Sequence, residues 1–257
     1  MIATRTDRPA PPEPKRVCLL TGAAGKLGTE FCRRHAERYD IVAVHRSRAP
    51  AVTSQEQRYV DPLDPFADLP DNAHPVFSVR ADLTAGGEIA RVVELALTRF
   101  DRIDVLVNAA AHWVMAPMVG SRALLESTQA QFEINTLVPL RLAIEVAEAF
   151  WRNRPDENRA RRRGVVNVSS ISGLRVFPGL HQSVYSASKA ALNYLSLHMA
   201  EEFGSFGVRV NALLPTSFPR IIPSERVADA VAQLDADGSS GEIVVVDAQG
   251  ERRIQLY

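Results

Sequence analysis

Short apolar runs alternate with segments of helical periodicity along most of this chain. The runs of strand length are residues 16–20, 40–46, 76–79, 102–108, 165–168, 208–214 and 242–247. Apolar residues recur at helical spacing between several of these runs, most clearly over residues 87–100. This alternation predicts right-handed crossovers and a doubly wound α/β sheet, in which the C-terminal ends of the strands line the ligand crevice.

A long helix predicted over residues 130–152 contains Asn135 and Pro139. Because proline has no N–H, the carbonyl of Asn135, four residues earlier, is expected to lose its helical partner. A carbonyl freed in this way can bind a water molecule. The alternative is a kink filled by packing, with no chemical role.

The composition restricts the possible functions. The 257 residues are 46% hydrophobic and have a formal net charge of zero, which argues against general electrostatic binding to nucleic acid or to an anionic membrane. Apolar runs stay well short of the roughly 20 residues that span a bilayer. We expect Cys18 and Cys32 to be buried and reduced, as in a cytoplasmic protein. The six histidines show no metal-ligand spacing.

The chain is predicted to form one domain over residues 16–257. Residues 1–15 contain four prolines and no apolar core, which predicts a flexible tail. Residues 49–75 are proline-rich and acidic and predict an irregular surface excursion. Residues 152–164 predict a polar hinge, with the arginine run at 161–163 in solvent.

A glycine-rich turn follows the first predicted strand. Gly22, Gly25 and Gly28 come between that strand and a helical pattern that extends to residue 39. Glycines let a backbone approach a pyrophosphate, and a helix N-terminus offers free N–H groups and the positive end of its dipole. The spacing departs from G-x-G-x-x-G because position 24 is alanine. The alternative is a tight turn without a ligand.

The second strand ends in basic residues. An acidic residue at this place usually holds the ribose 2′-hydroxyl of NAD, but residues 45–48 are His-Arg-Ser-Arg. Arg46 would suit the 2′-phosphate of NADP, which accepts a bidentate guanidinium, and Lys26 in the turn adds charge. We therefore predict NADP rather than NAD, against the alternative that these arginines are merely exposed.

Tyr185 and Lys189 stand four residues apart in a run of helix formers at residues 187–203. On a helix both side chains would point the same way. A fixed ammonium beside a phenol lowers the pKa of the phenol and prepares it for proton transfer near neutral pH. An isolated Tyr-x-x-x-Lys more often marks a solvated helix face, so the other segments carry the argument.

Together these segments make the chain resemble the short-chain dehydrogenase/reductase family, from residue 16 to about 250. The resemblance rests on Thr21-Gly22 with Gly28, Asp82-Leu83, Asn108-Ala109-Ala110, Asn135, Ser170, Tyr185 with Lys189, and Asn211 with Pro215. It implies a seven-stranded parallel sheet of Rossmann type with helices on both faces. It also implies Tyr185 as general acid/base, Lys189 at the nicotinamide ribose, a serine at the substrate carbonyl and Asn135 in a water-linked proton relay. The cofactor-binding residues that follow are Gly22, Gly25, Lys26, Leu27, Gly28, Arg46, Asp82, Leu83, Asn108, Ala109, Tyr185, Lys189 and Pro215.

The chain departs from the family pattern at several places. Its glycine spacing resembles the extended and divergent branches, whereas its catalytic half resembles the classical branch. Ser170 matches the motif but lies two residues further from Tyr185 than is usual, and Ser172 has the usual distance; we select Ser170. Thr216 replaces a glycine, and the segment to the last strand is short. That predicts an open site for a large or carrier-bound substrate, with His112, Trp113 and His181 as candidates to line it.

The predicted function is NADP(H)-dependent reduction of a carbonyl, or oxidation of an alcohol, on a small or carrier-bound molecule. Two alternatives are a non-redox relative that binds the cofactor as a regulator, and an isomerase or dehydratase that uses bound cofactor transiently. The family resemblance also implies a homodimer or homotetramer, paired through the helices over residues 135–152 and 185–203. No nucleic-acid or membrane partner is expected.

Overall fold

A single eight-stranded sheet organises the computed structural model, which describes residues 15–52 and 76–256. The strand order is β3-β2-β1-β4-β5-β6-β7-β8, and every pair except the last is parallel. The strands are β1 (Arg16–Thr21), β2 (Tyr39–His45), β3 (Val76–Arg80), β4 (Val105–Asn108), β5 (Gly164–Val168), β6 (Arg209–Pro215), β7 (Ile243–Asp247) and β8 (Gly250–Ile254).

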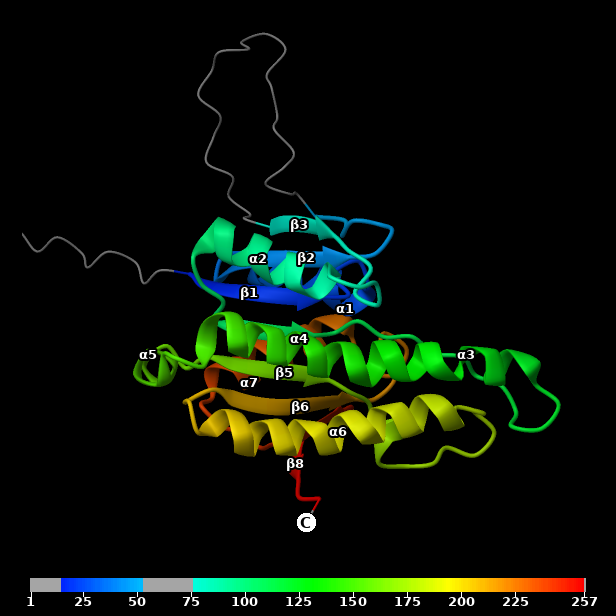
Figure 1. Ribbon diagram of the computed structural model, residues 1–257. Coiled ribbons are helices and arrows are strands. Elements are labelled where there is room, and N and C mark those ends of the chain that lie inside the picture. The colour runs from blue at the N-terminus through cyan, green and yellow to red at the C-terminus, as the bar shows by residue number, and fades with distance from the viewer. Residues whose placement is uncertain (1–14, 53–75, 257) are drawn as a thin grey trace, which may run out of the picture.

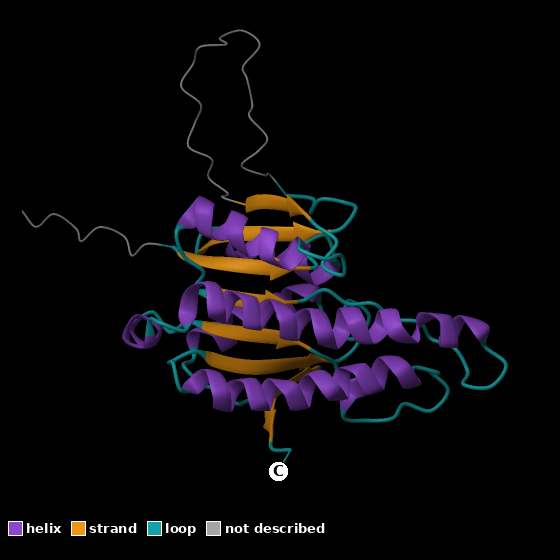
Figure 2. Cartoon of the chain, in the orientation of Figure 1, coloured by secondary structure: helices purple, strands orange, loops and turns teal. Residues whose placement is uncertain are grey.

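Helices cover both faces of this sheet, as the sequence predicts (Figures 1 and 2). One face packs against α1 (Lys26–His35) and α7 (Ser224–Ala236), which also contact each other. The other face packs against α2 (Glu88–Phe100), α4 (Val138–Val146) and α6 (Ser183–Gly204). The two apolar layers explain why the central strands are buried along almost their whole length. The predicted Rossmann-type architecture is confirmed.

The strand count differs from the predicted seven parallel strands. An eighth strand, β8, pairs antiparallel with β7 at the edge of the sheet. Its sequence is Gly-Glu-Arg-Arg-Ile, and its central three residues are exposed. Arg252 pairs with Asp247, and Arg253 with Asp237 and Glu242. The sequence did not predict this strand because its residues show no alternation of apolar and polar positions. Charge on an edge strand is a usual protection against aggregation.

The ligand edge of the sheet lies where the strand order reverses, between β1 and β4. Here the chain first adds β2 and β3 on one side and then β4 and β5 on the other. The Thr21 hydroxyl at the end of β1 accepts the backbone N–H groups of Ala109 and Ala110 at 3.0 and 3.1 Å. This contact holds the ends of β1 and β4 together at the reversal, where ligands bind in open α/β sheets.

The long helix predicted over residues 130–152 is not continuously α-helical. It consists of α3 (Arg122–Phe132), a π-helical segment η1 (Glu133–Leu137), α4 and a second π-helical segment η2 (Ala147–Trp151). In η1 the N–H of Val138 bonds to the carbonyl of Glu133, five residues earlier. Pro139, which stands in the first turn of α4, cannot donate a backbone hydrogen bond. Asn135 lies inside η1, so the interruption occurs at the residue that the sequence singles out.

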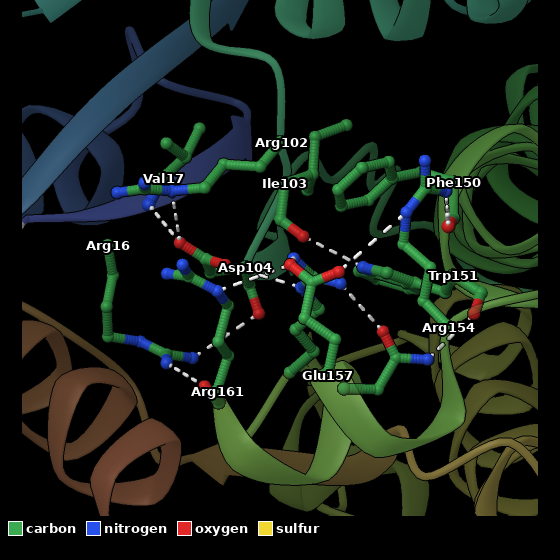
Figure 3. A network of polar contacts seen from close by, with 12 residues as sticks. Arg16, Val17, Arg102, Ile103, Asp104, Phe150, Trp151, Arg154, Glu157 and Arg161 are labelled. Atoms are coloured by element: carbon green, nitrogen blue, oxygen red, sulfur yellow. Dashed lines mark hydrogen bonds and ion pairs between the residues drawn. The ribbon is translucent and has the colours of Figure 1, made fainter.

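The polar hinge predicted over residues 152–164 is wrong in two respects. It contains a helix, α5 (Pro155–Ala160), and the side chain of Arg163 is fully buried. The Arg163 guanidinium pairs with Asp104 at 3.4 Å and Glu157 at 2.5 Å and also bonds to Asn158. Figure 3 shows this network at the edge where the strands begin. A run of arginines predicts side chains exposed to solvent. Arg163 is buried instead, because the carboxylates of Asp104 and Glu157 lie beside it in the fold.

The tail predicted for residues 1–15 and the irregular excursion over residues 49–75 lie mostly outside the described residues. Cys18 and Cys32 are buried free thiols, as expected. None of the helices in the described part of the chain is long and apolar enough to cross a membrane.

Candidate active site

The glycine turn between β1 and α1 is built from close backbone contacts. Gly22 has a φ of +67°, and a Cβ atom there would lie 2.7 Å from the backbone nitrogen of Ala110. A Cβ on Gly28 would lie 2.5 Å from the carbonyl oxygen of Gly22. Both positions therefore require glycine, because backbone atoms cannot yield as a flexible side chain would. The turn is thus shaped by its own packing and by the backbone that follows β4.

The N-terminus of α1 is free to receive an anion. Gly25 occupies the N-cap position and supplies no side-chain cap, and the first turn contains no acidic residue. Lys26 is exposed beside this terminus, whereas Leu27 is buried under it. The unpaired N–H groups and the positive dipole end favour a phosphate here. The residues present therefore fit the pyrophosphate of a dinucleotide.

Basic groups lie beside the turn at the end of β2. The Arg48 guanidinium donates to the carbonyl of Ala24 at 3.4 Å, and Arg46 is exposed near Asp82. Hydrogen bonds from Thr84, with a smaller contribution from the charge of Arg46, hold the pKa of Asp82 below its usual value. Leu83 is buried next to it. Arg46 and Asp82 thus flank the cradle from neighbouring strand ends, although Arg48, not Arg46, touches the glycine turn.

Asn108 ends β4 in a buried chain of amides. Its Nδ2 donates to Asn167 Oδ1 at 2.9 Å, and Asn167 in turn donates to the Ser196 hydroxyl on α6 at 2.9 Å. The Oδ1 of Asn108 is buried without a partner in the described residues. Such an acceptor costs free energy unless a donor reaches it, and a cofactor hydroxyl would be one. Sequence reasoning missed Asn167 and Ser196; the only signal was an asparagine inside an apolar strand.

Tyr185 and Lys189 both lie in the first turns of α6, as predicted. Tyr185 is half-buried, and this burial raises its pKa above the usual value, while a hydrogen bond with Ser170 opposes the shift. The predicted lowering of the Tyr185 pKa by Lys189 is therefore wrong. The Lys189 ammonium is fully buried and donates to the carbonyl of Val168 at 2.9 Å, and burial lowers its own pKa to about 7.

The two candidate serines have different surroundings. Ser170, at the end of β5, interacts with Tyr185, and its hydroxyl accepts the N–H of Ser172 at 3.1 Å. The Ser172 hydroxyl accepts from the amide of Gln182 at 2.9 Å. Of the two serines, Ser170 is therefore the one near enough to the phenol to affect its pKa.

Asn135 bonds to three groups around the site. Its side chain accepts the N–H of His112 at 2.9 Å and donates to the His112 carbonyl at 2.7 Å and to the Ser188 hydroxyl at 3.0 Å. Ser188 donates in turn to the carbonyl of Tyr185 at 2.7 Å. Asn135 thus connects the loop after β4 to the helix turn that carries Tyr185. All its amide hydrogens are used, so any relay role falls to its main chain.

A comparison with protein families decides the identity of this fold. The model that describes the short chain dehydrogenases matches residues 16–219. The chain belongs to the short-chain dehydrogenase/reductase family.

Individual relatives agree with this assignment. The chain is 28% identical to the acetoacetyl-CoA reductase of Allochromatium vinosum over 78% of its own length and 74% of the relative's. It is 30% identical to carbonyl reductase [NADPH] 2 of Sus scrofa over 77% of its length and 70% of the relative's. A crystal structure of a short chain dehydrogenase from Mycobacterium avium matches with a TM-score of 0.75 at 22% identity, covering 95% of this chain and 85% of that one.

The two loops beside the candidate active site of this dehydrogenase contact neighbouring elements and each other. Gln131, fully buried on α3, accepts the N–H of Val114, and the N–H of Ala116 donates to the carbonyl of His181 at 2.8 Å. The loops before α3 and before α6, which extend beyond the strand ends in Figure 1, are therefore joined. Their large apolar side chains are exposed, among them Trp113, Met115, Val176 and Leu180.

Pro215, the last of the predicted cofactor-binding residues, lies at the end of β6 in this short-chain dehydrogenase. Pro215 is the last residue of β6 and lies opposite Val246 of β7, and the next N–H, of Thr216, bonds to the Val246 carbonyl. Only residues 216–223 join β6 to α7. Within the described residues no group of three or more His, Cys, Asp or Glu side chains is placed to hold a metal ion.

Proposed function

We propose that this protein is an NADP(H)-dependent oxidoreductase that transfers hydride between a nicotinamide and a carbonyl or hydroxyl group. The observation that carries the proposal is the placement of Ser170 near the phenol of Tyr185, with Lys189 one helical turn further along α6. Membership of an oxidoreductase family supports the reaction class. The protein's part is to hold the reactants and to move one proton.

The proposal gives the following residues a part in holding the cofactor. Gly22, Gly25 and Gly28 would face the pyrophosphate with Lys26 beside it, Asp82 and Leu83 would meet the adenine, and Asn108, Ala109 and Pro215 would border the riboses and nicotinamide. Lys189 would hold the nicotinamide ribose. When bound, the nicotinamide supplies or accepts the hydride.

Tyr185 is the proton donor of the proposed reaction. Its raised pKa keeps the phenol protonated at neutral pH, which suits carbonyl reduction, because the new alkoxide oxygen must receive a proton there. The Ser170 hydroxyl would bond to the same oxygen and orient it. In reduction the carbon gains the hydride, the oxygen gains the phenolic proton, and Tyr185 is reprotonated from solvent. The main-chain carbonyl of Asn135 is our candidate for the water of that relay.

NADP is the proposed cofactor because Arg46 and Arg48 lie at the end of β2, where a 2′-phosphate would need cations. The porcine relative is named for NADPH, which supports the same preference. For the substrate, the reductase of A. vinosum is named for an acyl-CoA, and exposed apolar loops suit a large or carrier-bound molecule.

The test has a binding step and a turnover step. Nicotinamide fluorescence during titration with NADPH and NADH measures binding. Reduction of a panel of ketones and acetoacetyl-CoA then measures turnover for the wild type, Tyr185→Phe and the matched control Tyr194→Phe, an exposed tyrosine on the same helix. We expect Tyr185→Phe to bind NADPH normally and to lose turnover about 10²–10⁴-fold. Binding without any turnover would instead favour a regulator, and failure to bind either dinucleotide would overturn the proposal.

The assembly proposed with this function is a homodimer or homotetramer in the cytoplasm. Ile144 on α4 is exposed on one of the helices that the family resemblance assigns to subunit pairing. Light scattering of the purified protein measures the mass directly. A monomer at micromolar concentration would contradict this part.

A further inference from the structure

We propose a second, anion-binding pocket at the opposite edge of the sheet, where the strands begin. This pocket has a volume of about 370 Å³ and lies between α5, the end of α6, the start of β6 and the turn after α7. In Figure 1 this edge is the side on which α5 lies, away from the start of α6. The inference does not depend on the proposed function, since none of the proposed catalytic residues lines this pocket.

Three arginines line the pocket: Arg159, Arg162 and Arg209. A guanidinium has five N–H donors. Arg159 donates to Asp156 at 3.2 Å, and Arg162 donates to the carbonyl of Ala236 at 3.4 Å. Most of the donors on these two arginines are therefore available to a ligand.

Arg209 is the innermost of the three, with its side chain 13% exposed. Its Nη atoms donate to the carbonyls of Arg162, Asp235 and Ser239. Its Nε is buried with no partner in the described part of the chain. Arg209 thus uses its Nη donors on the protein and contributes mainly its positive charge to the pocket.

The charges around the pocket are unbalanced. No Asp or Glu lines it. The carboxylate of Asp156 that faces Arg159 is fully exposed, so water screens that pair. Asp235 lies 3.5 Å from Arg209, but it also pairs with Arg16 at 2.9 Å and accepts from the Tyr39 hydroxyl. One shared carboxylate thus serves two arginines, Arg159 has only a water-screened partner, and no ion pair of Arg162 occurs among the described residues.

Two other residues shape the pocket for a ligand. Gly207 has a φ of +77°, and a Cβ there would lie 2.7 Å from Arg159 Cγ, so glycine lets Arg159 lie against the wall. The Ser240 hydroxyl accepts the N–H of Val210 at 3.2 Å and keeps its own proton to donate. Guanidinium and hydroxyl donors around a concavity are the donor set for a phosphate group.

The volume limits the size of the ligand. About 370 Å³ is at the small end of ligand sites, which run from roughly 300 to 1,000 Å³. A dinucleotide would not fit, whereas a small phosphorylated metabolite would. The arginines also cap the C-terminus of α7 through the carbonyls of Asp235 and Ala236, so a purely structural role is the competing explanation.

The experiment is calorimetric titration of the full chain with ribose 5-phosphate at fixed ionic strength, with ribose and inorganic phosphate as comparison probes. Arg159→Gln/Arg162→Gln removes the two outer positive charges of the pocket, and Arg46→Gln/Arg48→Gln is the matched control at the other edge. We expect saturable binding of ribose 5-phosphate that weakens at least tenfold in the first double variant, stays in the second, and is absent for ribose. Inorganic phosphate binding at the same residues would identify the phosphate group alone as the ligand.

Three results would overturn the proposal that this pocket binds an anion. They are the absence of saturable binding, binding that only the Arg46/Arg48 variant weakens, and a heat of titration that sodium chloride reproduces at equal ionic strength. The melting temperatures of the ligand-free variants report folding. If the double variant is unstable, Arg159→Gln alone decides, because this arginine has only an exposed partner. Cofactor binding and turnover are measured separately, so failure here leaves the proposed reaction untouched.

Discussion

The side chain of Asn135 forms two hydrogen bonds with the main chain of His112, accepting its N–H at 2.9 Å and donating to its carbonyl at 2.7 Å. This reciprocal contact mimics one rung of a β-ladder, and it fixes the loop that leaves β4 over the candidate active site. Asn135 can reach the loop because it lies in the π-helical segment η1, whose wider turn accompanies Pro139. An amide is needed, because only an amide both accepts and donates in this geometry.

Asn135→Ala should therefore loosen the loop. Removing the amide leaves the N–H and carbonyl of His112 without these partners, and we expect the free energy of unfolding to fall by about 2–3 kcal/mol. Hydrogen–deuterium exchange at His112 should accelerate more than exchange in α6. Gln129→Ala, an exposed amide of α3, is the control and should change neither quantity. Unchanged exchange at His112 would show that the loop is held by other contacts.

Lys189 predicts a pH dependence of stability. Its pKa is about 7 in the folded state against an ordinary 10.5, because burial disfavours the ammonium. Between these values the unfolded chain binds more protons, so the contribution of Lys189 to the free energy of unfolding rises with pH; below pH 7 both states are charged and the penalty is full. We therefore compare the free energy of unfolding of Lys189→Met with that of the wild type. The variant's advantage should be about 2–3 kcal/mol larger at pH 6 than at pH 9.

Urea unfolding at several pH values in this range measures this margin, which is the difference in free energy of unfolding between Lys189→Met and the wild type. Lys26→Met, which changes an exposed lysine of α1, is the control and should keep a constant margin. A margin for Lys189→Met that does not change with pH would show that the ammonium is compensated in the folded protein.

Arg46 and Arg48 predict the choice between the two dinucleotides. Arg46→Gln should weaken NADPH about tenfold or more and leave NADH nearly unchanged, since only NADPH carries the 2′-phosphate. The single Arg46 variant is the cleaner test, because Arg48 also bonds to the glycine turn at Ala24. Fluorescence titration gives both dissociation constants, with the exposed Arg122→Gln on α3 as control. Equal weakening of both dinucleotides would remove the argument for NADP.

Arg163 predicts a large loss of stability far from the candidate active site. Arg163→Gln would leave the carboxylate of Asp104, which is 1% exposed, without one of its cations, and breaking a buried pair costs about 3–5 kcal/mol. Arg161→Gln, which removes only an exposed pair with Glu157 at 3.3 Å, should cost less than about 1 kcal/mol. Urea unfolding compares the two. Equal small losses would mean that water or Arg102, 3.0 Å from Asp104, compensates the carboxylate.

Local sequence patterns account for much of this protein. The seven parallel strands are predictable because each is a largely apolar run, and most of its residues are buried. The position of Tyr185 and Lys189 on one helix is predictable because helical spacing depends only on neighbouring residues. The glycine turn is predictable for the same reason, since the need for Gly22 and Gly28 arises largely within one strand–turn–helix unit and the strand beside it.

Tertiary structure decided what depends on residues far apart in the chain. The edge strand β8 is polar and is defined by its pairing with β7. The burial of Arg163 depends on Asp104, and the amide chain from Asn108 to Ser196 depends on three elements meeting at one place. The pKa values of Tyr185 and Lys189 follow from burial, which overrides the effect expected from their spacing. Sequence alone determined which residues are neighbours on a strand or helix; the desolvation and the charges around each of them exist only in the folded chain.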